Sequence, residues 1–242
     1  MLSTRLVTLC FDANDPLRLA RFWAATLHWD IHDETVEEIG LVPTDGTRFV
    51  FLFLPVPELK VGKNRIHLDL VSESPAHQAE MVDRLIALGA QRVDIGQSRD
   101  DDHVVLADPE GNEFCVVLRG VFLANTDVLG AIVFEPADPI VGRFWSEATG
   151  WPIVYDQDGD TAIRDPDGRG PFVTFGPPTG AAKTGKNRVH LDIAPPPDGD
   201  QAAEVERLIA LGARRIDIGQ GDVSWVVLTD PEGNEFCVLT PL

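Results

Sequence analysis

The sequence predicts an α+β fold made of four β-α-β-β-β modules that form two cup-shaped domains. Long stretches of the chain occur twice at a nearly constant offset, and a repeat of this length indicates two copies of one domain of about 120 residues. Within each copy the pattern of strand, helix and three strands occurs twice. The repeated stretches are GKNRIHLDL at 62–70 and GKNRVHLDI at 185–193, RLIALGAQRVDIGQ at 84–97 and RLIALGARRIDIGQ at 207–220, and DPEGNEFCV at 108–116 and 230–238.

The second module of the first copy is the most clearly patterned. Apolar and polar residues alternate at 66–70, which predicts a strand. Ser74 and Pro75 provide a helix cap and a first helical residue, and Gly89 ends the helix. Strands are then expected at 91–96, 103–107 and 113–118, with the turn 108–112 before the last one. The same order is expected in the second copy.

The first module of each copy has the same order with weaker signals. In copy one we expect a strand at 6–11, a helix opened by Asp15 and Pro16, and strands near 30–31, 37–42 and 48–54. In copy two we expect a strand at 129–134, a helix opened by Asp138 and Pro139, and strands near 153–155, 161–164 and 171–175. Asp158 and Gly159 read as a two-residue hairpin turn. The predicted domains are therefore 1–119 and 128–242, with a linker at 120–127.

Composition restricts the classes of partner. A net charge of −19 opposes binding to nucleic acid or an anionic membrane and favours a small-molecule partner. The sequence contains no apolar run of about 18 residues, and Asp12 and Asp15 stand where a signal peptide would be apolar. Three cysteines do not make a disulfide framework, so a reducing cytoplasm is expected.

The motifs of the chain resemble those of the vicinal oxygen chelate superfamily, which includes glyoxalase I and bleomycin-resistance proteins. The resemblance rests on the paired modules and on DPLRLARFW at 15–23, NRIHLDL at 64–70, LGA at 88–90 and DPEGNEFC at 108–115. It implies that two modules curve into an open cup, which in some members holds a divalent metal. The scaffold hosts lyases, isomerases, dioxygenases and drug-binding proteins, so the resemblance implies a fold more strongly than a reaction.

The resemblance also implies where metal ligands would lie. One place is on the first strand of each module, and the other is on the last strand, four residues after a turn glycine. The first-strand places fall on Thr8, His67, Ala131 and His190, and the last-strand places on Val50, Cys115, Phe172 and Cys237. If consecutive modules formed each cup, one cup would contain Thr8, Val50, His67 and Cys115, and the other Ala131, Phe172, His190 and Cys237.

Two good donors per cup are fewer than the roughly three that a catalytic metal needs. Asp69 and Glu113 lie two residues from His67 and Cys115, about 6.6 Å along a strand, which is too far for a shared coordination point. We therefore expect no metal or other cofactor, although a divalent metal stays possible. A composite Cys2His2 site would require the second and fourth modules to face each other. Its ligands would be His67, Cys115, His190 and Cys237.

Several side chains have both a structural and a functional interpretation. His67 and His190 either order the sheet by hydrogen bonding or act as ligand contacts and proton-transfer groups. Cys115 and Cys237 are expected to be packing residues, with a Cys–His nucleophile as the minor alternative. Arg65 with Glu113 and Arg188 with Glu235 are expected to be cross-strand ion pairs.

The chain's lysines fall in two loops, which precede the strands that contain His67 and His190. Each loop is either simply solvated or forms a positively charged entrance for an anion. The residues expected to line the cups are Thr8, Val50, Lys63, Arg65, His67, Asp69, Glu113, Cys115, Phe172, Lys186, Arg188, His190, Asp192, Trp225, Glu235 and Cys237.

The function favoured by these observations is binding of a small molecule, such as sequestration of an antibiotic or another small organic compound, anionic ones included. One alternative is an enzyme: either a metal-dependent lyase, isomerase or dioxygenase, or a metal-free acid–base enzyme that uses His67 or His190. The other alternative is an assembly module without a ligand. The chain is expected to be a monomeric pseudo-dimer or a homodimer. The sequence leaves open whether modules pair within a copy or across a pseudo-twofold axis.

Overall fold

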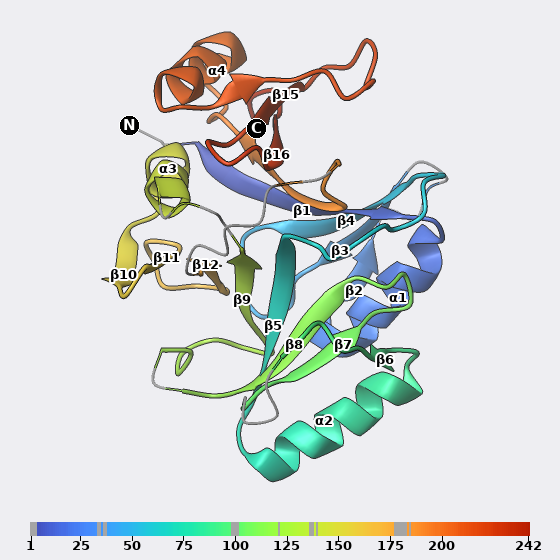
Figure 1. Cartoon of the computed structure of the whole chain (residues 1–242). Coiled ribbons are helices and arrows are strands. Elements are labelled where there is room, and N and C mark those ends of the chain that lie inside the picture. Colours follow the sequence, from blue (N-terminus) through green and yellow to red (C-terminus); the bar gives the residue numbers. More distant parts are fainter. Residues whose placement is uncertain are drawn as a thin grey trace.

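The computed structural model describes residues 4–32, 35, 38–97, 102–120, 122–135, 138, 140–176, 183 and 185–242. Within these residues the chain forms two mixed eight-stranded sheets, with helices packed against them (Figure 1). The α+β fold of β-α-β-β-β modules predicted from the sequence is therefore confirmed. None of the described helices combines the length and the apolar character that crossing a bilayer requires.

Sheet A joins the first module of the chain to the last. Its strand order is β14-β15-β16-β13-β1-β4-β3-β2. The first module consists of β1 (Arg5–Ala13), α1 (Pro16–Leu27), β2 (Asp30–His32), β3 (Ile39–Val42) and β4 (Val50–Pro55). The last module consists of β13 (Val189–Ala194), α4 (Gln201–Ala210), β14 (Arg214–Arg215), β15 (Val226–Thr229) and β16 (Glu235–Val238).

Sheet B joins the two middle modules, in the order β10-β11-β12-β9-β5-β8-β7-β6. The second module consists of β5 (Ile66–Ser72), α2 (Pro75–Ala87), β6 (Gln91–Arg92), β7 (Val104–Ala107) and β8 (Glu113–Leu118). The third consists of β9 (Leu129–Phe134), α3 (Ile140–Thr149), β10 (Ile153–Gln157), β11 (Asp160–Ile163) and β12 (Phe172–Phe175).

The modules thus pair across the two copies. Antiparallel pairing of β1 with β13 joins sheet A, and antiparallel pairing of β5 with β9 joins sheet B, where the two strands lie side by side at the centre (Figure 1). Of the two pairings that the sequence left open, pairing across the copies is the one observed, because each sheet takes one module from each copy. Two domains in one chain are consistent with a pseudo-dimer, and the division of the chain at 120–127 stays a prediction.

Local sequence signals set the helix ends as expected. The Asp15 side chain accepts a hydrogen bond from the Arg18 backbone N–H at 3.1 Å, and Ser74 accepts one from His77 N–H at 3.2 Å. The helix predicted to open at Asp138 and Pro139 begins at Ile140, and residue 139 lies outside the described residues. His28 ends α1 with a φ of 60°, in the left-handed region that the equivalent Gly150 occupies with a φ of 71°.

Two predicted segments give different outcomes. Asp158 and Gly159 both have positive φ and connect the antiparallel strands β10 and β11, which confirms the hairpin turn. The strand predicted at 91–96 is only Gln91–Arg92. Beyond it, the Gly96 backbone N–H bonds to the Asp94 side chain at 2.8 Å, so this part of the chain turns instead of extending the ladder.

Buried tryptophans hold the two modules of each copy together. Trp23 of α1 packs against Phe114 of β8 with ring centroids 5.3 Å apart, and its Nε1 donates to Asp108 Oδ2 at 3.2 Å. Trp145 of α3 donates to Asp230 Oδ2 at the same distance. Burial raises the pKa of Asp108 to about 6, against hydrogen bonds that lower it. The two tryptophans therefore belong to the core and fix sheet A against sheet B.

Candidate functional site

The centre of each sheet presents a group of polar side chains on one face. In sheet A, His190 and Asp192 are two residues apart on β13, so they lie on the same face. Cys10 of β1 is the lateral neighbour of His190, and Cys237 of β16 is the lateral neighbour of Asp192. The pairing of modules across copies thus brings a residue of copy one next to three residues of copy two.

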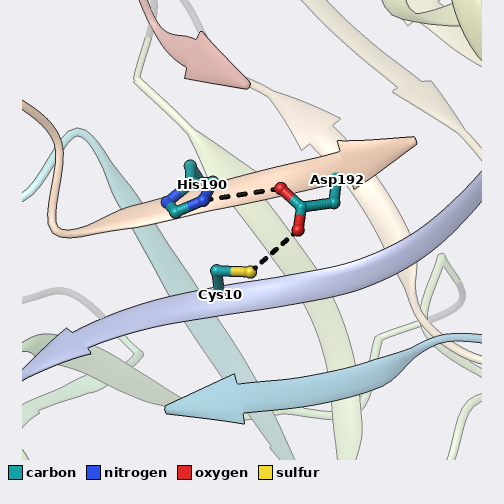
Figure 2. A group of neighbouring side chains, drawn as sticks. All are labelled: Cys10, His190 and Asp192. Carbon is teal, nitrogen blue, oxygen red and sulfur yellow. Dashed lines mark hydrogen bonds and ion pairs between the residues drawn. The ribbon is translucent and has the colours of Figure 1, made fainter. Parts of the chain in front are cut away.

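Cys10, His190 and Asp192 form a compact buried group that we call cluster A (Figure 2). One ligand atom of each lies within 4.8 Å of the others. The Cys10 thiol donates to Asp192 Oδ2 at 3.2 Å, and His190 Nε2 lies 3.4 Å from Asp192 Oδ1. Cys10 is 1% exposed, and His190 and Asp192 are each 7% exposed. His190 Nδ1 and Asp192 Oδ1 are buried without a hydrogen-bond partner among the described residues.

His67, Asp69 and Cys115 form the equivalent group in sheet B, which we call cluster B. His67 Nε2 lies 3.5 Å from Asp69 Oδ1, and His67 Nδ1 lies 3.4 Å from Glu135 Oε1. Cluster B is more open than cluster A, since it lines a cavity of about 400 Å³. Val133 of β9 pairs with His67 as Cys10 pairs with His190, so cluster B has valine where cluster A has its first cysteine.

Asp69 was expected to lie too far from His67 to share a coordination point with it, and the same reasoning applied to Asp192 and His190. The structure shows that this expectation is wrong. The expectation used the distance along the backbone, but two side chains on one strand face lean toward each other and meet within 3.5 Å. The composite Cys2His2 site does not form, because His67 and Cys115 belong to sheet B whereas His190 and Cys237 belong to sheet A.

The ligand places of the superfamily's metal are regrouped by the observed pairing. Sheet A carries Thr8, Val50, His190 and Cys237 at these places, and sheet B carries Ala131, Phe172, His67 and Cys115. Alanine, valine and phenylalanine offer no donor atom, and each sheet keeps only one histidine and one cysteine as good ligands. The residues present therefore do not fit the superfamily's four-ligand arrangement.

The basic loops do not present free positive charge. Lys63 Nζ lies 2.6 Å from Glu135 Oε1, and Lys186 pairs with Asp12. The predicted ion pairs of Arg65 with Glu113 and of Arg188 with Glu235 are wrong. Both arginines precede their strands, and nearer lysines pair with the two glutamates. The observed pairs are Lys60–Glu113 at 2.8 Å, Lys183–Glu235 at 2.7 Å, Arg65–Glu232 at 3.6 Å and Arg188–Glu110 at 3.4 Å.

These loops meet between the two sheets. Both copies of the loop line one cavity of about 820 Å³, together with Asp12 and Glu135. Each lysine and arginine of this lining is paired with a carboxylate: Lys186 with Asp12, Lys63 with Glu135, Arg65 with Glu232 and Arg188 with Glu110. The interpretation as a positively charged entrance for an anion is therefore not supported, and the loop lysines stabilise the strand ends instead.

The thiols are poor nucleophiles in this setting. Burial, followed by the charge of Asp69, raises the pKa of Cys115. Burial and Asp192 act in the same way on the pKa of Cys237, and burial is also the main cause of the raised pKa of Cys10. These thiols stay protonated at neutral pH, which favours the packing interpretation over a nucleophile activated by histidine.

Trp225 lies apart from cluster A. It lines a separate cavity of about 390 Å³ with Gln220 and Val227, whereas His103, at the equivalent place in copy one, lines the cluster B cavity. Sequence reasoning missed Cys10, Asp12 and Glu135. The signal was available in the alternation of Thr8, Cys10 and Asp12, which places three polar side chains on one face of a buried strand.

Paired β-α-β-β-β modules with a polar cluster on each sheet define a protein of the vicinal oxygen chelate fold. The glyoxalase-like domain family matches residues 8–117 and 131–239, and the chain belongs to this family. No curated protein sequence matches the chain.

Two solved structures cover nearly the whole chain. Glyoxalase I from Zea mays is 14% identical with a TM-score of 0.69, and the match covers 98% of this chain and 92% of that one. A putative dioxygenase from Bacillus subtilis is 16% identical with a TM-score of 0.62, covering 99% of this chain and 86% of that one. At these identities the likeness establishes the fold alone.

Proposed function

We propose that the chain binds a small polar organic molecule in cup B, the cavity of about 400 Å³ on sheet B that cluster B lines. The observation that carries this proposal is the pair of buried atoms His67 Nδ1 and Asp69 Oδ1. Neither makes a hydrogen bond among the described residues, although His67 Nδ1 lies 3.4 Å from Glu135 Oε1 and Asp69 Oδ1 lies 3.5 Å from His67 Nε2. Both residues line the cavity. Buried polar atoms without partners are costly, and a bound guest would satisfy them. The volume suits one small ligand.

The charges of cup B indicate the chemistry of the guest. Glu113 and Glu135 are neutralised by Lys60 and Lys63, so Asp69 is the carboxylate of this lining that no lysine or arginine pairs with among the described residues. A guest with N–H or O–H donors, neutral or cationic, matches this acceptor better than an anion does. Apolar contacts are available in the same lining, from Ile95, Val105 and Val117.

Three probes of the same shape test this assignment: benzamidine, benzamide and benzoate, titrated by isothermal calorimetry or NMR. The cationic and neutral probes should bind with a Kd on the order of 1 mM, and benzoate more weakly. Asp69→Asn should raise the Kd for benzamidine at least about tenfold, which corresponds to about 1.4 kcal/mol of binding free energy. Asp192→Asn, the matched change in buried cluster A, should leave it unchanged. Preferential binding of benzoate, or equal loss in both variants, would contradict the proposal.

Sequestration of an antibiotic is one form of this function. If the guest is an antibiotic with donor groups, expression in a susceptible bacterial host should raise the inhibitory concentration. Asp69→Asn should abolish that increase without lowering the amount of folded protein. An increase that persists in the variant would separate resistance from cup B.

A second candidate is a metal-free acid–base enzyme centred on His67. His67 lies between two carboxylates, with Asp69 Oδ1 at 3.5 Å from Nε2 and Glu135 Oε1 at 3.4 Å from Nδ1, which is a suitable setting for a proton-transfer group. Hydrogen–deuterium exchange at the carbon next to the carbonyl of dihydroxyacetone, followed by NMR in D2O, tests it. Exchange should fall in His67→Ala and persist in His190→Ala; no exchange above the uncatalysed rate would leave binding as the function.

A further inference from the structure

We propose that cluster A is a binding site for a thiophilic divalent cation such as Zn²⁺, held by Cys10, His190 and Asp192. The site lies in sheet A, and the proposed organic guest lies in sheet B, so the two proposals can fail independently. Only His190 of these three occupies a ligand place that the superfamily uses. The other two, Cys10 of β1 and Asp192 of β13, lie outside those places.

Two separations in cluster A are close to those between the ligands of a coordinated metal, and the three ligand atoms all lie within 4.8 Å of one another. Zinc binds sulfur at about 2.3 Å and nitrogen or oxygen at about 2.0–2.2 Å, so tetrahedral ligands lie about 3.3–3.7 Å from one another. Cys10 Sγ is 3.2 Å from Asp192 Oδ2, and His190 Nε2 is 3.4 Å from Asp192 Oδ1. A cation would therefore enter with small side-chain rotations, and the strand pairing that fixes the three residues would not change.

The charges also balance. When the Cys10 thiol releases its proton to solvent, its thiolate and the Asp192 carboxylate together neutralise a divalent cation, and neutral His190 completes the set. A neutral assembly is the one that a buried site tolerates best. Lys186, a cation that acts on the neighbouring Cys237, is paired with Asp12 and does not oppose the metal. In addition, Asp192 Oδ1 is a buried atom without a hydrogen bond in the described chain, which a metal would satisfy.

Cys237 is the lateral neighbour of Asp192 on β16 and is not one of the three grouped ligands. A disulfide between Cys10 and Cys237 is excluded by the sheet, because β13 separates their strands. Two strand spacings place their Cα atoms about 9–10 Å apart, beyond the roughly 7 Å that a disulfide spans. Sulfur ligation favours Zn²⁺ over hard cations such as Mg²⁺.

The chain contains its own matched control. Cluster B keeps the histidine, the aspartate and the last-strand cysteine, but Val133 stands where Cys10 would be. Cys10→Val therefore converts the first-strand position of cluster A into that of cluster B with a side chain that the fold already accepts. Cys115→Val removes the thiol of cluster B and leaves cluster A intact.

The experiment uses the full chain stripped with a chelator and then titrated with Zn²⁺ against a chromophoric chelator. The zinc retained after desalting is measured by elemental analysis. The wild type should bind one zinc tightly. Cys10→Val should weaken this site at least about 100-fold, whereas Cys115→Val should change it less than about threefold. Titration with Co²⁺ should give a thiolate-to-cobalt charge-transfer band that Cys10→Val loses and Cys115→Val keeps. Circular dichroism confirms that each variant is folded.

Three results would overturn the inference. The first is a wild type that retains no zinc after desalting. The second is tight zinc that persists in folded Cys10→Val. The third is tight zinc lost in Cys115→Val, which would place the metal in cluster B and would also count against the metal-free function of cup B. If Cys10→Val fails to fold, Asp192→Asn replaces it and must lose the tight site, and retention of the zinc by that variant would equally contradict the proposal.

Discussion

Trp23→Phe tests how far the buried Asp108 depends on a hydrogen bond from α1. The Trp23 Nε1 donates to Asp108 Oδ2 at 3.2 Å, and the two residues are 1% and 2% exposed. Phenylalanine keeps most of the ring and removes this donor. A hydrogen bond to a charged group contributes about 1.5–3 kcal/mol. The smaller ring adds a packing loss of roughly 1–2 kcal/mol.

The hydrogen-bond part of this loss depends on pH. Burial raises the pKa of Asp108 to about 6 from an ordinary value of 3.8, and the Trp23 hydrogen bond is one of the effects that lower it. Because the folded pKa is above the unfolded one, the folded state binds the proton more readily. The stability that this group contributes is fully present below pH 4 and is lost as pH rises toward 6. Above that range the ionised carboxylate needs the donor most, so Trp23→Phe is more damaging there.

The expected loss of unfolding free energy is about 3–4 kcal/mol at pH 8 and about 1–2 kcal/mol less at pH 5. For a chain of this size the loss at pH 8 corresponds to a fall in Tm of roughly 10 °C. Thermal and urea unfolding followed by circular dichroism measure both values. Phe114→Leu is the control, since Phe114 packs on Trp23 but donates no hydrogen bond, and its loss should not change between the two pH values. Equal losses at pH 5 and pH 8 for Trp23→Phe would refute the reasoning.

Three further outcomes are expected. The fragments 1–119 and 128–242 should each lack a complete sheet as monomers. When the two are mixed, size-exclusion chromatography should show one compact species. Stable monomeric fragments would argue against pairing across copies. His28→Gly should stabilise the fold by up to about 1 kcal/mol in urea unfolding, because His28 has a φ of 60° where copy two has glycine, and a loss of stability would contradict this. Gly142→Ala should lower Tm, since its added Cβ would lie 2.7 Å from a side chain of β11.

The order of elements could be predicted because it depends on local signals. Asp15 with Pro16 and Ser74 with Pro75 set the helix starts through caps that act within one turn, and the alternation at 66–70 set a strand. The pairing of modules could not be predicted in the same way. The two copies have the same order of elements, and their second modules have nearly the same strands, so local signals do not tell a module whether to pair within its own copy or with the other one.

The site was predicted in part for a related reason. His67, His190, Cys115 and Cys237 stood out because both copies keep them. Cys10 did not, because copy two has Val133 at that place, and its neighbours in sheet A come from a module about 180 residues away in the sequence. The aspartates were excluded by a distance along the backbone, whereas the contact is made by side chains on one face.

Pairing across copies also explains how two clusters of common origin can differ. In a symmetric homodimer of one copy, both sheets would be identical, so any residue gained by one cluster would appear in the other. In this chain the second and fourth modules keep the same histidine, aspartate and cysteine. The first strands of the first and third modules differ, because Val133 and Glu135 in β9 are the equivalents of Cys10 and Asp12 in β1. The difference therefore lies in the strands that complete each cluster from the other copy. A single chain thus allows cluster A to be buried and rich in sulfur while cluster B stays open to a cavity, which is the asymmetry on which both proposals depend.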